Sequence, residues 1–131
     1  MILKDTSGHD IDPEIFRNKY VLMNFWASWC KPCRASNAEL KVLYDKYRGK
    51  GFEIVGISID EQKLPWKKAI VQDGMKWPQL NDEKGVQGTL CKYYDITGVP
   101  VKILLDNLGQ IVGFDLSVDE IQKILGKGLA N

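Results

Sequence analysis

The sequence contains few of the residues that metal sites and disulfide frameworks require. Its 131 residues include three cysteines and a single histidine. So small and odd a number of cysteines cannot form a disulfide framework, and it leaves at least one thiol free. Charge of one sign is not in excess either, since 18 lysines and arginines face 17 aspartates and glutamates. A nucleic-acid-binding protein usually carries a basic excess or a basic run, so we expect no nucleic-acid partner.

Long hydrophobic runs are also missing. The apolar stretches are only a few residues long, far below the roughly 20 residues that cross a bilayer. We therefore expect no membrane span in this chain. The first ten residues, MILKDTSGHD, lack the charged and apolar regions of a signal peptide. Two interpretations remain, a cytoplasmic protein or a protein whose leader or upstream domain lies outside this sequence.

The remaining composition is that of an ordinary globular protein. Hydrophobic residues make up 44% of the chain and charged residues 27%. The length is typical of one domain with its own hydrophobic core. We therefore expect a single domain over residues 1–131, with residues 1–19 as a polar, turn-rich N-terminal lead-in.

Hydrophobic patterning predicts alternating strands and helices after this lead-in. Strands are expected at Tyr20–Trp26, Phe52–Asp60, Val101–Leu105 and Gln110–Phe114. A short helix or turn is expected at Pro13–Asn18, with Asp12 as its N-cap. Helices are expected from the WCKPC motif to Gly49, at Lys63–Gly74, at Lys84–Asp95, and after the capping box formed by Ser117 and Glu120. Apolar residues at helical spacing predict the buried faces of the first two of these helices: Leu40, Leu43, Tyr44 and Tyr47 in one, and Trp66, Ile70 and Val71 in the other. A strand–helix–strand unit requires a parallel pair of strands, whereas the late hairpin requires an antiparallel pair. The fold class is therefore α/β, with a mixed central sheet and helices on both faces.

The most informative motif is the cysteine pair at the start of the helix that follows the first core strand. Unpaired backbone N–H groups at a helix N-terminus stabilise a thiolate, so we expect Cys30 to be a nucleophile near neutral pH. Cys33 lies one turn later, where it can attack a mixed disulfide formed on Cys30. Pro32 fits the first turn, because its missing N–H would have had no helical partner there.

Two other interpretations of the pair are a zinc half-site and two unrelated buried thiols. The strand–CxxC–helix context favours redox chemistry over both. The redox-active group would then be the disulfide between Cys30 and Cys33 itself, with no further cofactor.

The segment FWASWCKPCR, residues 25–34, resembles the active-site motif of the thioredoxin superfamily. From Tyr20 to the end, the chain is similar to TlpA/ResA-like thiol-disulfide oxidoreductases, a group related to AhpC/TSA proteins. The resemblance also includes GFEIVGISID, YDITGVP and DNLGQIVG. It implies a thioredoxin-like fold with Trp29 and Lys31 beside the reactive cysteine. It also implies a cis bond between Val99 and Pro100, with the Val99 backbone available to an extended substrate segment.

The same resemblance identifies Glu61–Tyr93 as an insert relative to a plain thioredoxin, with an extra helix and loop. Two tryptophans, Trp66 and Trp77, lie in this insert. They either pack the added elements onto the core or shape a surface for a partner.

The chain departs from the family pattern at two polar positions. Relatives usually carry an aspartate at the position of Asn24 and a glutamate at the position of Ser36. Both acids that handle protons near Cys33 are thus absent. Water or Lys31 would have to assist proton transfer, or the exchange is tuned differently.

The remaining cysteine and the histidine have less specific interpretations. Cys91 is expected to be a buried thiol, with regulation or glutathionylation as the alternative. His9 is expected at the surface. Together with Cys30 and Cys33 they could form a four-ligand zinc set, but their spacing is not that of a structural zinc site.

The leading hypothesis is an enzyme that exchanges disulfides with protein substrates. One alternative is a peroxiredoxin-like peroxidase, which needs a threonine where this chain has Ala27. Another is a non-catalytic redox or copper-binding module, whose relatives use a wider cysteine pair and a distal histidine. The resemblance implies a periplasmic or cell-envelope location, with electrons supplied by a membrane or soluble thiol donor.

Overall fold

A seven-stranded mixed sheet forms the centre of the computed structural model, which describes residues 2–129. The strand order is β2-β1-β5-β4-β3-β6-β7. The strands are β1 (Leu3–Asp5), β2 (Asp10–Ile11), β3 (Tyr20–Trp26), β4 (Phe52–Ser58), β5 (Gln79–Asn81), β6 (Val101–Leu105) and β7 (Ile111–Phe114).

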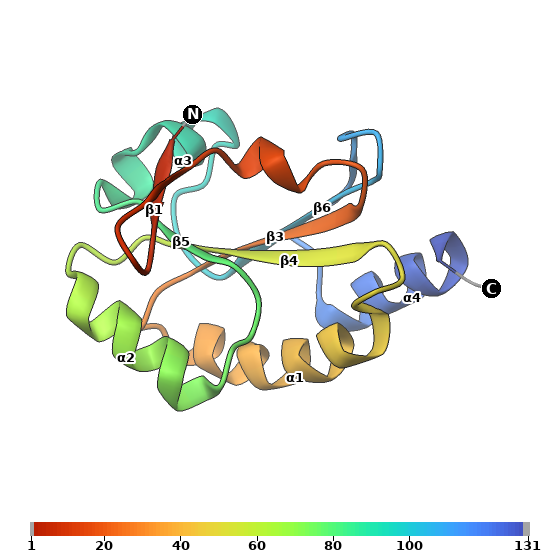
Figure 1. The fold of residues 1–131 in the computed structure, drawn as a ribbon, viewed down its shortest axis with the longest axis horizontal. Helices are drawn as coiled ribbons and strands as arrows, with labels where there is room; N and C mark the ends of the chain where they lie inside the picture. The colour runs from red at the N-terminus through yellow and green to blue at the C-terminus, as the bar shows by residue number, and fades with distance from the viewer. Residues whose placement is uncertain (1, 130–131) are drawn as a thin grey trace.

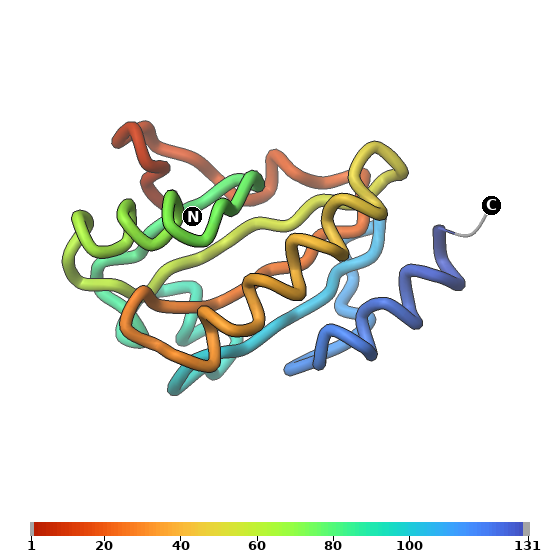
Figure 2. The backbone as a smooth tube through the Cα atoms, turned by 90° about the horizontal axis from the view of Figure 1, so that it is seen from below, coloured from red at the N-terminus to blue at the C-terminus, as the bar shows by residue number. Residues whose placement is uncertain are grey.

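Helices cover both faces of this sheet (Figure 1). Below it, in the view of Figure 1, lie α1 (Lys31–Tyr47), α2 (Lys63–Asp73) and α4 (Val118–Gly128). Above it lie α3 (Thr89–Tyr93) and the 3-10 turn η1 (Pro13–Phe16). Figure 2, seen from below, shows α1 crossing the sheet with α2 on one side and α4 on the other. This position of α1 determines which side chains surround the cysteine pair.

The central strands are the ones with the strongest hydrophobic patterning. β3 is buried along nearly its whole length and pairs in parallel with β4, with Tyr20 opposite Phe52 and Trp26 opposite Ser58. On its other side β3 pairs antiparallel with β6. A strand covered on both faces needs apolar side chains on both, which explains the continuous run YVLMNFW. The mixed sheet and the helices on both faces are as predicted.

Several local predictions are confirmed. Asp12 accepts a hydrogen bond from the N–H of Glu14 at the start of η1. Helix α4 begins with the predicted capping box, in which Ser117 and Glu120 satisfy each other's backbone N–H groups. The buried side chains of α1 include the four predicted from periodicity, namely Leu40, Leu43, Tyr44 and Tyr47.

The predicted helix over Lys84–Asp95 is wrong as a single element. It is divided into a 3-10 turn, η2 (Gly85–Gln87), and the short helix α3. Gly85 adopts a left-handed φ of 60°, and Gly88 is extended with ψ at 162°. Neither conformation continues an α-helix, so the two glycines divide the segment.

The predicted apolar stripe of α2 is only partly right. Trp66 is fully buried and Ile70 packs against the core, but Val71 is 81% exposed. The helix buries Ala69 instead, which places its inner face one position away from the expected one.

Three short strands were missed because each has only two or three residues. β1 and β2 form a hairpin within the supposed lead-in, and β1 pairs antiparallel with β5 of the insert. β5 in turn pairs in parallel with β4. Elements of two or three residues have no periodicity of their own, so no local pattern could predict them.

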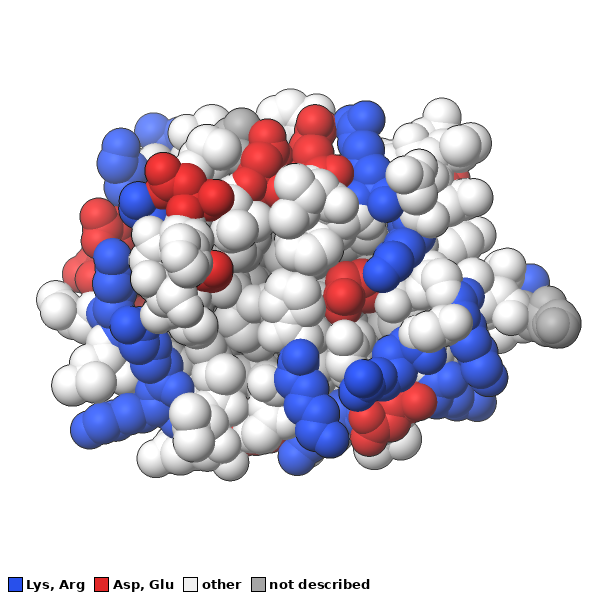
Figure 3. All heavy atoms as spheres, viewed as in Figure 1, with Lys and Arg blue, Asp and Glu red and all other residues white. Residues whose placement is uncertain are grey.

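The surface carries both signs of charge. On the face drawn in Figure 3, basic and acidic side chains alternate with uncharged ones and neither sign covers the face. Within residues 2–129, no helix combines the length and apolarity needed to cross a bilayer.

Candidate active site

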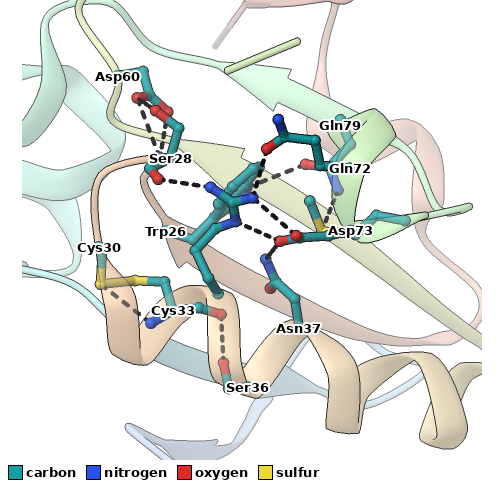
Figure 4. A network of polar contacts seen from close by, with 12 residues as sticks. Trp26, Ser28, Cys30, Cys33, Ser36, Asn37, Asp60, Gln72, Asp73 and Gln79 are labelled. Atoms are coloured by element: carbon teal, nitrogen blue, oxygen red, sulfur yellow. Dashed lines mark hydrogen bonds and ion pairs between the residues drawn. A yellow bond between two sulfur atoms is a disulfide. The ribbon is translucent and has the colours of Figure 1, made fainter. Parts of the chain in front are cut away.

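Cys30 and Cys33 lie where β3 ends and α1 begins. Cys30 is the N-cap of α1, and the backbone N–H of Cys33 donates to its Sγ at 3.2 Å. The two sulfur atoms form a disulfide (Figure 4). Cys30 is 6% exposed and Cys33 1% exposed. The amide that now caps the Cys30 sulfur would stabilise a thiolate there after reduction.

The peptide bond between Val99 and Pro100 is cis, as predicted. In the antiparallel pair of β3 and β6, Val101 lies opposite Phe25, which places Pro100 beside the end of β3. The carbonyl oxygen of Val99 lies 3.9 Å from Cys30 Sγ. The backbone before the cis proline therefore borders the reactive sulfur.

The outer rim of the site is open to solvent. Trp29 is 67% exposed, and Lys31 and Pro32 are also exposed. A groove of about 580 Å³ runs beside Trp29, and its lining includes Glu61, Gln62, Thr97 and Gly98. Trp29, the residue directly before Cys30, is therefore both exposed and part of this groove.

A buried carboxylate supports the loop before Cys30. Asp60, 2% exposed, accepts hydrogen bonds from the N–H and hydroxyl of Ser28 and from the hydroxyl of Ser58. These bonds hold the loop at the end of β3 against the end of β4. The strand predicted over Phe52–Asp60 ends at Ser58, and the next two residues belong to this support.

A second group of side chains, the Arg34 cluster, joins α1 to α2 and comprises Ser28, Arg34, Asn37, Gln72 and Asp73 (Figure 4). Arg34 donates to both carboxylate oxygens of Asp73, at 2.6 and 2.9 Å. It also donates to the carbonyl oxygen of Ser28 and to the side chain of Gln72. The residue directly after Cys33 thus fixes the active-site loop to the inserted helix.

The Arg34 cluster is electrostatically balanced. Burial raises the pKa of Asp73, but hydrogen bonds from Arg34 and Asn37 lower it by more, so the net pKa lies below the ordinary 3.8. The bond to Asp73 in turn raises the pKa of Arg34. Both groups are therefore held in their charged forms.

The resemblance singled out two polar positions, Asn24 on β3 and Ser36 on α1. Asn24 is 1% exposed, and its amide nitrogen donates to Asn37 at 3.4 Å. Its amide oxygen has no hydrogen-bond partner among residues 2–129. Ser36 donates to the carbonyl oxygen of Cys33 at 3.1 Å.

The sequence analysis missed a third polar residue at this place, Lys102. Its side chain is buried, and its Nζ donates to Ser36 Oγ at 3.0 Å. Lys102 is the Cα partner of Asn24 across the β3–β6 pair, so both side chains lie on the face covered by α1. The available signal was a lysine inside the otherwise apolar strand VKILL. Lys31, the candidate that sequence reasoning named, is at the surface instead.

Cys91 and His9 lie on other elements than Cys30 and Cys33. Cys91 is buried on α3, and burial raises the pKa of its thiol to about 11. His9 is exposed in the hairpin of β1 and β2, beside Asp5. Among the described residues, no group of three or more histidine, cysteine or acidic side chains is placed to hold a metal ion.

The tryptophans of the insert pack inward. Trp66 is 0% exposed and Trp77 4% exposed, and Trp77 packs edge-on against Tyr44 of α1. Of the two interpretations of these tryptophans, packing of the insert onto the core is therefore the one that their burial supports.

Comparison with known proteins gives a consistent result. Residues 18–111 match a family model described as thioredoxin-like. The thiol-disulfide oxidoreductase ResA of Bacillus thuringiensis is 34% identical over 111 residues, which cover 85% of this chain and 62% of the relative. The chain thus spans less than two thirds of the length of this relative.

Solved structures agree more completely in length. A thiol-disulfide oxidoreductase from Bacteroides fragilis is 37% identical with a TM-score of 0.89, over 98% of this chain and 96% of that one. The thioredoxin domain of a thiol-disulfide oxidoreductase from Bacteroides vulgatus is 33% identical with a TM-score of 0.90, over 98% and 92%.

Proposed function

The chain belongs to the thioredoxin-like family, and from that premise we propose that it is a thiol-disulfide oxidoreductase acting on protein substrates. The observation that carries the proposal is the sulfur of Cys30 at the N-terminus of α1, capped by the N–H of Cys33 and bonded to the Cys33 sulfur. This geometry suits a thiolate nucleophile and a resolving thiol one helical turn apart.

The reaction needs only the two cysteines as redox groups. In the reduced protein, the Cys30 thiolate attacks a substrate disulfide, a mixed disulfide forms and the first substrate sulfur leaves as a thiolate. The Cys33 thiolate then attacks Cys30 Sγ, which forms the Cys30–Cys33 bond and releases the second substrate sulfur. Two electrons pass from the protein to the substrate, and two protons follow through solvent. We therefore propose that no further cofactor takes part.

The substrate is proposed to be an extended segment of another protein. The groove is lined by Trp29, Thr97 and Gly98, close in sequence to Cys30 and to the cis proline, and the Val99 backbone borders the sulfur. Backbone pairing with Val99 would hold such a segment without demanding a particular sequence. The exposed indole of Trp29 supplies apolar contact area next to the reacting atoms.

We further propose a periplasmic or cell-envelope location, with a thiol protein in solution or in the membrane as electron donor. The support is the resemblance to TlpA/ResA-like proteins. Trapping tests both parts, because a Cys33→Ser variant cannot release a partner bound to Cys30. Expressed in the native cell, it is expected to collect extracytoplasmic proteins through disulfides. Recovery of cytoplasmic partners alone would refute the location.

Activity is tested by turnover of a protein disulfide with dithiothreitol as the reductant. Wild type and Cys91→Ala are expected to reduce insulin at similar rates, since Cys91 is buried away from the pair. Cys30→Ser is expected to lose the catalysed rate. If Cys30→Ser retains that rate, or if the wild type reduces hydrogen peroxide faster than insulin, the proposal is wrong.

A further inference from the structure

Lys102 is a buried cation for which the proposed reaction gives no role so far. Lys102 is the second residue of β6, and only 5% of it is exposed. Burying an ammonium group without a carboxylate partner is unfavourable. Within residues 2–129, Lys102 has no acidic side chain at ion-pair distance. A buried, unpaired ammonium group lowers the stability of the fold, so we expect its charge to have a function.

Two hydrogen bonds connect this charge to the second cysteine. The ammonium of Lys102 donates to Ser36 Oγ, and the Ser36 hydroxyl donates to the backbone carbonyl of Cys33. Lys102 reaches Ser36 from β6, and Ser36 lies three residues after Cys33 on α1, so the Ser36 hydroxyl bridges the ammonium and the Cys33 backbone.

The groups around Lys102 leave its charge largely uncompensated. Burial lowers the pKa of Lys102, while the carboxylates of Glu39 on α1 and Asp115 after β7 act in the opposite direction. Both of these acids are exposed and therefore screened by solvent. From β3, the facing side chain is Asn24, which is neutral. Asp73, the half-buried acid of α2, is already paired with Arg34.

We propose, resting on the thiol-disulfide exchange proposed above, that Lys102 is a positioning residue whose ammonium, held by Ser36, favours the Cys33 thiolate. A carboxylate at this place disfavours a neighbouring thiolate, whereas a cation favours it.

The charge acts in the resolving step. While a substrate is bonded to Cys30, Cys33 must lose its proton before its sulfur can attack Cys30 Sγ. The proton passes to solvent, and the ammonium compensates the negative charge on Cys33 until the new disulfide forms and the substrate thiolate leaves. The charge also stabilises the reduced protein relative to the disulfide, because only the reduced form contains a thiolate.

The test titrates Cys33 directly, without turnover. In a Cys30→Ser background, the ultraviolet absorbance of the Cys33 thiolate is followed against pH for Lys102, Lys102→Met, Lys102→Gln and Lys102→Arg. We expect Lys102→Met and Lys102→Gln to raise the midpoint by about one pH unit. Lys102→Arg is expected to retain most of the original midpoint, because it keeps the charge. Lys127→Gln, at an exposed position of α4, serves as the control and is expected to change nothing.

If the Lys102→Met protein does not fold, the Lys102→Gln variant still decides the test. Its amide can donate to Ser36 but carries no charge. A folded Lys102→Gln protein with an unchanged midpoint would overturn the proposal and leave Lys102 a structural residue. A second readout is the equilibrium of the full Cys30–Cys33 protein with glutathione. Lys102→Gln is expected to move it toward the disulfide, and no movement would also contradict the proposal. Neither result depends on insulin turnover, so a failure of the proposed function is distinguishable from a failure of this inference.

Discussion

Charged side chains on the two sides of helix α1 differ in their partners. On the side of α2, the Arg34 cluster pairs one cation with one carboxylate through two hydrogen bonds. On the side of β6, Lys102 has a hydroxyl partner in Ser36 and no carboxylate among the described residues. Asn37 and Asn24 lie between them as a neutral link, bonded to each other and, through Asn37, to Asp73.

Because of this difference, the paired charges stabilise the geometry of the site, whereas the unpaired charge affects the ionisation of its cysteines. A paired charge has its electrostatic effect cancelled nearby, so it contributes mainly geometry and stability. A buried charge without an opposite partner projects its field over several ångströms, because the surrounding medium screens it weakly. The Arg34 cluster therefore fixes the loop that carries the cysteines, whereas Lys102 acts on their ionisation.

Removing the ion pair between Arg34 and Asp73 is expected to have the largest effect, which is a loss of stability. Asp73→Ala leaves Arg34 without its partner in a partly buried place, so we expect a loss of about 2 kcal/mol in the free energy of unfolding. Urea unfolding measures it, with Asp45→Ala on the exposed face of α1 as the control. A loss no larger than that of Asp45→Ala would show that the cluster does not hold the loop.

The paired side also predicts a dependence of stability on acid. The pKa of Asp73 is lower in the folded protein than its ordinary 3.8, so its contribution is complete above that pH and is lost as pH falls below it. The stability difference between wild type and Asp73→Asn is therefore expected to shrink below pH 3.8. A difference that stays constant from neutral pH to below this value would contradict the assignment.

The charge of Lys102 can be compensated with a single substitution. Asn24→Asp places a carboxylate opposite Lys102 across the β3–β6 pair, which neutralises the local charge. In the Cys30→Ser background we expect the Cys33 midpoint to rise by about half a pH unit. Asn107→Asp, in the exposed turn between β6 and β7, is the matched control. Equal midpoints in wild type and a folded Asn24→Asp protein would show that this place does not govern Cys33.

The smallest effect is expected at Cys91, which belongs to neither side. Because burial raises the pKa of this thiol to about 11, iodoacetamide at pH 8 is expected to leave it unmodified in the folded, oxidised protein. Peptide mass spectrometry checks this result. Rapid labelling would instead favour the interpretation of Cys91 as an accessible, regulated thiol.

The parts that could be predicted from the sequence are those whose signals are local. The run YVLMNFW, the capping box at Ser117 and the position of Cys30 before a helix each carry their physical reason within a few residues. The cis bond at Pro100 was predicted through resemblance. The strands β1, β2 and β5 could not be predicted, since each is only two or three residues long, and β1 and β5 pair with segments distant in the sequence.

The polar surroundings of Cys33 were not predictable for a related reason. The sequence showed two absent acids, at Asn24 and Ser36, but nothing local connects them with a residue 66 positions after Ser36. The β3–β6 register makes that connection, because it places Lys102 opposite Asn24. A lysine within an apolar strand is a visible anomaly, yet only the fold shows which group it faces.

The assignment of roles to the two cysteines is tested most directly by the rate of mixed-disulfide formation with oxidised glutathione at neutral pH. Reduced Cys33→Ser, which retains Cys30, is expected to form a stable adduct rapidly, because Cys30 is at the N-terminus of α1 with the N–H of residue 33 directed at its sulfur. Reduced Cys30→Ser, which retains Cys33, is expected to react at least about tenfold more slowly, because Cys33 is shielded behind it. Equal rates, or faster reaction of Cys33, would contradict the account.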